Sequence, residues 1–302
     1  MLRDFEIFRT VMTSGSASKA AALLGISQPG VSQCLRKLEV RAGLALFQRV
    51  RGRLVPTPEA QALHAEIERS FVGLDAIEHR LRSLRQFGVG RLSLASYPAF
   101  GMGFLPRVLA RYGLLKRETT ASLQIMSSRD VRARVLAGQC DLGLMADEAS
   151  TVGMEHSEFA RAAGVVVMPA RHKLARKQVI EAHDLSGVPF ISLNPEDAAR
   201  RRLDAAMALH GEQIRTVVET PYAITACELV LRGVGLGIVH PLTALEGAER
   251  GLVLRRFALE VPFSCILALP PGKPMSEQVQ VFVSDMRRQL AADMRAVEKL
   301  LD

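Results

Sequence analysis

Polar side chains gather on one face of a predicted helix in the stretch GISQPGVSQCLRKLE, residues 25–39. Val31, Leu35 and Leu38 recur at helical spacing, which indicates a face that packs on a core. The opposite face carries Ser32, Gln33, Arg36 and Lys37. Hydroxyl, amide and guanidinium groups bind phosphates and the base edges of the DNA major groove. The stretch therefore predicts a helix with one packed face and one face for a polar partner.

The start of this helix suits close approach to an anion. Ser27 is the expected N-cap, and Gln28 and Pro29 follow it in the first turn, where proline loses no hydrogen bond. Gly30 adds no side chain where the helix end would come closest to a partner. Because the free N–H groups of a helix N-terminus bind anions, this turn favours contact with a phosphate or a base edge.

The sequence lacks the usual catalytic and metal-binding patterns. Its seven histidines are scattered, with no H-E-x-x-H and no G-x-S-x-G motif. The four cysteines form no C-x-x-C pair, so they indicate neither a zinc site nor a disulfide framework. GVGLG at 233–237 follows a predicted helix and opens a strand, the reverse of a dinucleotide-binding loop. We expect reduced thiols, no enzyme, no catalytic residues, no metal and no cofactor.

Positive charge is concentrated near the N-terminus. The 302 residues carry a net charge of +8, and residues 1–90 hold 13 Lys and Arg against 8 Asp and Glu. A basic N-terminal third indicates a polyanionic partner, and this length suggests two or three structural units. No apolar run reaches the ~20 residues of a membrane span, and the opening MLRDFEIFRT does not resemble a signal peptide. We therefore expect a cytoplasmic protein without a membrane partner.

The N-terminal part predicts three helices and a basic hairpin. The second helix, capped by Ser16, is joined to the helix of residues 27–39 by a tight turn at Gly25, which is helix-turn-helix spacing. The following ALFQRVRGRLVPTPEA predicts a small β wing around a glycine turn. Its cations are Arg49, Arg51 and Arg53. Such a wing would lie on the phosphate backbone, and a solvated run of charge is the alternative.

A long helical pattern follows between Pro58 and about Phe87. Its apolar residues recur every three or four positions: Leu63, Ile67, Phe71, Leu74, Ile77, Leu81 and Leu84. A stripe of this length predicts packing against a second copy of the chain, because it has no core of its own. We therefore expect a homodimer formed through this helix. The alternative is a helix packed back on its own wing domain.

From residue 88 onward, short apolar strands alternate with helices, which is typical of parallel α/β units. Two open sheets with a cleft between them fit this pattern, and a final helix over 276–301 would close over one of them. The expected strands cover residues 91–95, 121–126, 141–145, 164–168, 189–193, 216–219, 235–239 and 263–269.

Four strand-to-helix junctions are candidates for a ligand site, because ligands of open α/β sheets bind beyond the carboxyl ends of strands. The junctions contain Ser96 and Tyr97, Ser127 and Ser128, Asn194, and His240. A ligand carboxylate would use free helix N–H groups there. A ligand amino group would need an acceptor such as Asn194 Oδ1 or a nearby acid. Ser96 and Ser127 also suit plain N-caps, a role compatible with ligand binding.

The chain resembles the LysR-type transcriptional regulators over essentially its whole length. The resemblance is carried by residues 11–39 and by LALFQRVRGRLVPTPEA, FLPRVLARY, CDLGLM, RHKLA and GVGLGIVHPLTALE. It implies an N-terminal winged helix-turn-helix over 1–58, a dimerising linker helix over 59–88 and a periplasmic-binding-protein-like α/β effector domain over 91–302. The implied subdomains of the effector domain are about 91–165 with 270–302, and about 166–268. Family members are often tetramers.

The resemblance also implies site residues. Ser27, Gln28, Pro29, Ser32 and Arg36 match the DNA-binding helix of the family, whereas Gly30, Gln33 and Cys34 stand where Ala, Arg and Gln are usual. Gln33 is a candidate for a bidentate contact with adenine, and an exposed helical glutamine is the alternative. In the effector domain, Tyr222 and Ile224 fall at positions that line the cleft.

The function implied by the resemblance is promoter binding controlled by a small molecule. The motifs are similar to those of members that respond to diaminopimelate and to opines, which implies an amino acid or a derivative such as diaminopimelate or lysine as effector. Another small organic acid and a redox signal sensed by cysteines remain as alternatives. A solute-binding protein and an enzyme are disfavoured. The operator, the target genes and the sign of regulation stay open.

Overall fold

The computed structural model describes residues 2–50, 53–68, 91–272 and 274–302. The chain divides into two units, one within residues 1–78 and the other within 79–302. Each unit is described by itself below. Of the residues expected to form a linker helix, 69–88 lie outside the described residues.

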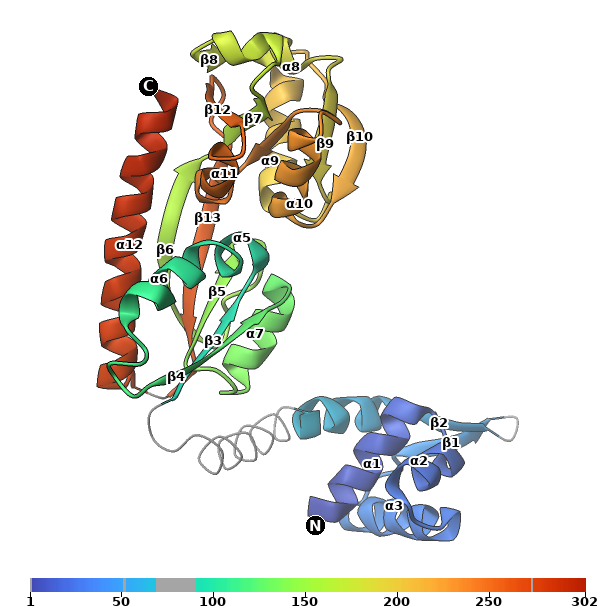
Figure 1. Ribbon diagram of the computed structural model, residues 1–302. Helices are drawn as coiled ribbons and strands as arrows, with labels where there is room; N and C mark the ends of the chain where they lie inside the picture. Colours follow the sequence, from blue (N-terminus) through green and yellow to red (C-terminus); the bar gives the residue numbers. More distant parts are fainter. Residues whose placement is uncertain (1, 51–52, 69–90, 273) are drawn as a thin grey trace. The chain divides into compact units, whose positions relative to one another are not determined.

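Unit 1 begins with three helices, α1 (Leu2–Ser14), α2 (Ala17–Leu24) and α3 (Gln28–Ala42) (Figure 1). Their apolar faces form one core around the fully buried Phe8 and Val31. Gly25 ends α2 with a φ of 63°, a left-handed conformation that costs glycine little because it has no Cβ. The chain can therefore turn sharply and begin α3 three residues later. The predicted helix-turn-helix is confirmed.

A two-stranded hairpin follows the helices. Strands β1 (Phe47–Val50) and β2 (Arg53–Pro56) are antiparallel, with Phe47 opposite Pro56 and Val50 opposite Arg53. This is the predicted wing. The helix of residues 58–68 comes next, and Ala60 and Ile67 join the core of unit 1. The described start of that helix thus packs on its own unit, and its expected pairing with a second copy falls on residues that are not described.

Unit 2 contains a five-stranded sheet in the order β4-β3-β5-β13-β6. β3 is parallel to its neighbours β4 and β5, whereas β13 runs antiparallel to β5 and β6. The strands are β3 (Arg91–Ser96), β4 (Thr120–Ile125), β5 (Leu142–Ala146), β6 (Glu155–Ala163) and β13 (Pro262–Leu269). The helices between its strands are α5 (Pro98–Gly101), α6 (Phe104–Tyr112) and α7 (Ser128–Leu136).

A second group of strands forms a four-stranded sheet, β11-β7-β12-β8, and a parallel pair, β10-β9. A bridge between Phe190 and Leu236 joins β9 to the segment before β11. The strands are β7 (Val165–Pro169), β8 (Val179–Ile180), β9 (Pro189–Leu193), β10 (Arg215–Thr220), β11 (Gly237–Val239) and β12 (Leu252–Phe257). The helices of this part are α8 (Ala182–Leu185), α9 (Ala198–Leu209), α10 (Ala223–Leu231) and α11 (Pro241–Ala248), with a 3-10 turn at Lys173–Arg176.

Two expectations about these sheets were wrong. Both longer sheets are mixed rather than parallel, since each contains antiparallel pairs. The sequence analysis did not predict the strands β6, β8 and β12. Residues 262–268, expected in the second subdomain, form β13 of the five-stranded sheet. The chain leaves that sheet at Gly164 and returns at Val261, and the Gly164 N–H donates to the Val261 carbonyl at 2.8 Å.

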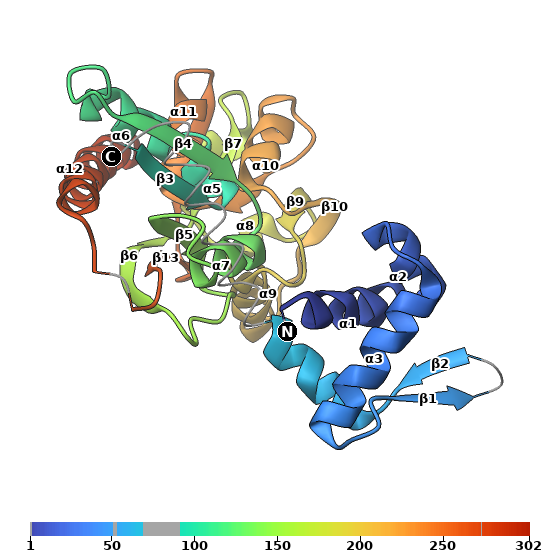
Figure 2. The same ribbon diagram turned by 90° about the horizontal axis from the view of Figure 1, so that it is seen from below.

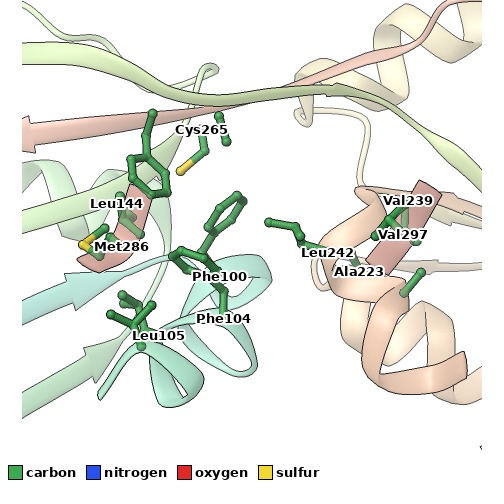
Figure 3. Packing of buried hydrophobic residues seen from close by; sticks show 14 of the residues in the cluster. Phe100, Phe104, Leu105, Leu144, Ala223, Val239, Leu242, Cys265, Met286 and Val297 are labelled. Carbon is green, nitrogen blue, oxygen red and sulfur yellow. The ribbon is translucent and has the colours of Figure 1, made fainter. Parts of the chain in front are cut away.

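The largest apolar core of unit 2 joins residues from both sheets and from the last helix (Figure 3). Phe100 and Phe104 lie edge to face, with ring centroids 5.3 Å apart. Helix α12 (Glu277–Leu301), which the sequence predicts over 276–301, is capped by Ser276 and contributes Met286 to this core. It contacts α6, α11 and β12, and its position beside α6 can be followed in Figures 1 and 2. Helix α12 therefore packs on one helix from each group of strands and directly on β12.

Candidate functional site

The N-terminal turn and outer face of α3 present the polar residues expected from the sequence. Ser27 Oγ accepts the Gly30 N–H at 3.3 Å and caps the helix, and Gln28 Nε2 donates to Ser32 Oγ at 2.9 Å. Ser32 is half-buried. The exposed residues are Ser27, Gln28, Pro29, Gln33, Arg36 and Lys37.

The opposite face of α3 fixes the helix in place. Val31, Leu35 and Leu38 are buried in the core of unit 1. The Glu39 carboxylate accepts the N–H groups of Leu46 at 2.8 Å and Phe47 at 3.1 Å, and so ties the first wing strand to α3. In the sequence Glu39 is only the single acidic residue among the cations of residues 36–53. Its hydrogen bonds to the wing depend on the tertiary fold and could not be predicted.

The wing arginines are placed only in part. Arg49 lies opposite Leu54, and Arg53 opposite Val50, in the β1–β2 ladder. These two residues are described by their backbone alone, and Arg51 lies outside the described residues.

Unit 2 contains a cavity of about 520 Å³, measured with the part open to solvent. Its walls come from the starts of α5, α9, α10, α11 and β13 and from the ends of β5 and β9. The lining residues are Tyr97, Pro98, Ala99, Ala146, Asp147, Glu148, Leu193, Asp197, Ala199, Pro221, Tyr222, Ala223, His240, Phe263 and Ser264.

Three of the predicted effector residues, Tyr97, Tyr222 and His240, line this cavity. The other predicted residues are not among its lining: Ser96, Ser127, Ser128, Asn194 and Ile224. Several of these have structural partners instead. The buried Ser96 hydroxyl donates to the Tyr97 carbonyl at 2.9 Å. Ser127 caps α7, as its alternative role predicted, and Ser128 Oγ accepts the Ala146 N–H at 3.1 Å.

His240 is a buried neutral histidine with a defined tautomer. It is 2% exposed, and burial lowers its pKa to about 3. Its Nδ1 atom accepts the Leu242 N–H at 3.1 Å, so the proton of the neutral ring must sit on Nε2. That Nε2 atom has no hydrogen-bond partner among the described residues. A buried donor without a partner is costly, which makes it a candidate for a ligand contact.

Three carboxylates in the cavity wall were not expected from the sequence. Asp147 is paired with Arg202, which also donates to the Pro262 carbonyl at 2.8 Å. Desolvation raises the pKa of Glu148, and it also raises the pKa of Asp197, which caps α9 by accepting the Ala199 N–H at 2.8 Å. Asp147 and Glu148 directly follow β5, so the rule about strand ends could have found them.

The N-terminus of α10 also faces the cavity. Pro221, Tyr222 and Ala223 lie in the cavity wall, and no side chain caps this nine-residue helix at Tyr222. The first N–H groups of a helix lack intrahelical acceptors. This helix end therefore offers N–H donors to a ligand anion.

The four cysteines are free thiols, and all are buried. Burial is the main cause that raises the pKa of Cys34 to about 11 and that of Cys227 to about 12. It also raises the pKa of Cys265 far above its usual range. Because the thiolate is the reactive form, this setting favours structural thiols over a redox sensor.

Neither a membrane span nor a metal centre is formed by the described residues. No described helix is long and apolar enough to cross a membrane. Nor does the described part of the chain bring together histidine, cysteine and carboxylate side chains in a group that could hold a metal ion.

Comparison with known proteins finds relatives for both units. Residues 2–61 match the family described as bacterial regulatory helix-turn-helix protein, lysR family, and residues 85–291 match the LysR substrate binding domain. The chain is 40% identical to the transcriptional activator protein LysR of Escherichia coli, covering 99% of this chain and 96% of that protein. It is 31% identical to the octopine catabolism/uptake operon regulatory protein OccR of Rhizobium meliloti, covering 85% of each.

Solved structures share the fold. Full-length CbnR complexed with its target DNA superposes with a TM-score of 0.62 at 20% identity, covering 96% of this chain and 99% of that one.

Proposed function

The chain belongs to the LysR family of bacterial transcription regulators, which are not enzymes. We propose that it binds promoter DNA through α3 and the β1–β2 wing. We further propose that an effector in the unit 2 cavity controls this binding. The observation that carries the DNA-binding assignment is the two-faced α3. Its apolar stripe is buried in the core while its polar residues face outward. An exposed polar helix of this kind fits the DNA major groove.

The proposed roles follow from chemistry and position. Ser27, Gln28, Pro29 and Ser32, at the start of α3, approach the phosphate backbone and the groove edge. Gln33 and Arg36, in the second and third turns of α3, read base edges. The wing arginines, which are Arg49, Arg51 and Arg53, bind phosphates.

The proposed assembly is a homodimer formed through the helix expected over 59–88, with two dimers joining in a tetramer. A symmetric pair of reading helices suits two half-sites of an operator. We also propose that the protein acts in the cytoplasm, where promoter DNA is found.

The proposed effector is an amino acid or a derivative such as diaminopimelate or lysine. It would sit against Tyr97, Tyr222 and His240, the three predicted effector residues that line the cavity. One relative regulates an octopine catabolism operon, and octopine is an amino acid derivative, which supports this class.

Binding would stabilise one orientation of the two sheet groups and so change how the assembly spaces its DNA-reading pairs. DNase footprints of equal length and bend with and without the effector would contradict this mechanism.

The test of DNA binding starts with genomic fragments captured by the full-length protein. Fluorescence anisotropy then gives the affinity for an enriched fragment over a range of salt concentrations. We expect log affinity to fall linearly with log salt, and the Arg51→Ala/Arg53→Ala double variant to flatten the slope by about 0.9 for each phosphate that the wing no longer neutralises. Gln33→Ala should change which fragments are preferred, through a decrease of roughly 1–3 kcal/mol in discrimination.

The matched control is Lys116→Ala, which removes an exposed cation from unit 2. It should leave both the slope and the preference unchanged. Capture of fragments without any sequence enrichment would overturn the proposed function.

A further inference from the structure

The cavity of unit 2 has an uneven charge distribution. Arg202 neutralises Asp147, but Glu148 and Asp197 form no ion pair with a cation among the described residues. Desolvation is the main cause that raises the pKa of both carboxyls, and repulsion from neighbouring acids adds to it. Hydrogen bonds to both groups, and Arg201 near Asp197, oppose this shift without reversing it. A cation placed between them would relieve this repulsion. This side of the cavity therefore suits an ammonium group.

The wall formed by α10 and α11 has the opposite character. His240 belongs to this wall and has a buried Nε2–H donor with no partner among the described residues, and the uncapped N-terminus of α10 adds backbone donors. Neither group can neutralise the two carboxylates, because the His240 ring is neutral at physiological pH. Donors of this kind bind a carboxylate.

We propose that the cavity binds an amino acid in one orientation, with its ammonium group at Glu148 and Asp197 and its carboxylate at the His240 Nε2–H and the α10 N-terminus. This inference rests on the proposed function, since it assigns the effector groups to named side chains. It makes Glu148, Asp197 and His240 the residues that determine effector class. A dicarboxylate without an amino group would leave both acids unpaired, and a diamine would leave the donor wall unpaired.

The chain itself supplies a binding signal. It has no tryptophan and three tyrosines, and two of these, Tyr97 and Tyr222, line the cavity. Tyrosine fluorescence of the full-length protein can therefore follow titrations without a label. Two matched pairs of probes separate the groups: diaminopimelate against pimelate, which lacks both amino groups, and lysine against cadaverine, which lacks the carboxylate.

Three variants test the two ends of the cavity. Glu148→Gln removes a charge at nearly constant shape, and Asp197→Asn does so while keeping a residue that caps helices well. His240→Phe removes the donor and keeps an aromatic ring beside Phe100, whose centroid is 5.1 Å from that of His240. Glu158→Gln is the control, because Glu158 is exposed on β6 and is not part of the cavity wall.

The expected result is that diaminopimelate or lysine binds at least about tenfold more tightly than its matched probe, the scale of one charge-assisted hydrogen bond. Glu148→Gln and Asp197→Asn should weaken binding of the amino acid about tenfold without weakening pimelate, and Glu158→Gln should match the wild type. His240→Phe should weaken the amino acid but not cadaverine.

Equal binding of pimelate and diaminopimelate, or unchanged affinities in all three cavity variants, would overturn the proposed orientation. Failure of every probe at millimolar concentration would overturn the amino acid assignment. In either case DNA capture and anisotropy with the same preparation show separately whether the proposed function stands.

Discussion

The carboxylate of Glu39 on α3 accepts the backbone N–H of Leu46 at 2.8 Å, and Leu46 is only 1% exposed. A second bond, from the Phe47 N–H, makes this side chain a link between α3 and the first wing strand. The orientation of the wing is thus set from within the helix beside it.

We predict that Glu39→Ala destabilises unit 1 by about 1–3 kcal/mol, because it leaves the N–H groups of the buried Leu46 and the half-buried Phe47 without this acceptor. Urea unfolding followed by circular dichroism measures this change in the unit 1 transition. Glu39→Gln keeps an acceptor oxygen and should retain most of the stability. An alanine variant as stable as the wild type would show that the bonds contribute nothing to the fold.

The buried His240 predicts a pH dependence with a definite sign. Its pKa is about 3 in the fold, whereas an unfolded histidine titrates near 6.5. Between these values the unfolded chain takes up a proton that the folded chain does not, so stability falls as pH falls through this window. From pH 7 to pH 5 the expected decrease in stability is about 2 kcal/mol.

The test compares urea unfolding of the wild type and His240→Asn at several pH values. Asparagine can still accept the Leu242 N–H as an N-cap, so the fold of α11 is preserved. The raised pKa values of Glu148 and Asp197 act with the opposite sign and are common to both proteins, so they cancel. Equal pH dependence in the two proteins would contradict the prediction.

The crossing point at Gly164 predicts a strict need for glycine. A Cβ there would lie 2.6 Å from Phe263 Cε2 and 2.7 Å from Ile238 Cγ2. Gly164→Ala should therefore lower the stability of unit 2 by about 1–3 kcal/mol through overpacking. Gly237→Ala is the matched control, since its nearest neighbour would be at an ordinary 3.5 Å. Thermal unfolding should separate the two variants, and equal melting temperatures would be evidence against the crowding.

Arg107 on α6 connects two other helices of unit 2. Its guanidinium donates to the buried Asp293 of α12 at 2.9 and 3.1 Å and also pairs with Glu246 of α11. Arg107→Met should lower the free energy of unfolding of unit 2 by about 3–5 kcal/mol, because it leaves the Asp293 charge buried without a cation. The double variant Arg107→Met/Asp293→Leu should recover part of this stability in urea unfolding. A double variant no more stable than the single one would contradict the ion-pair account.

The sequence by itself determined the local features of this protein. Caps at Ser16 and Ser27, the turn at Gly25 and the apolar stripe of α3 all follow from short-range rules, and the structure has them where they were predicted. The spacing of two N-terminal helices, a tight turn and a basic hairpin is enough to predict a winged helix-turn-helix. The residues that contact one another in this motif are close in the sequence.

Only the tertiary structure decided how unit 2 is connected and which side chains meet in its cavity. β13 pairs with β5 and β6 in the first sheet. These partners lie about 100 residues or more earlier in the chain, so no local sequence pattern predicts the pairing. The strand-end rule predicts His240 and could have found Glu148, but that these two residues and Asp197 line the same cavity does not follow from the sequence. Long-range hydrogen bonding and core packing bring them together, and the charge of the cavity follows from that arrangement.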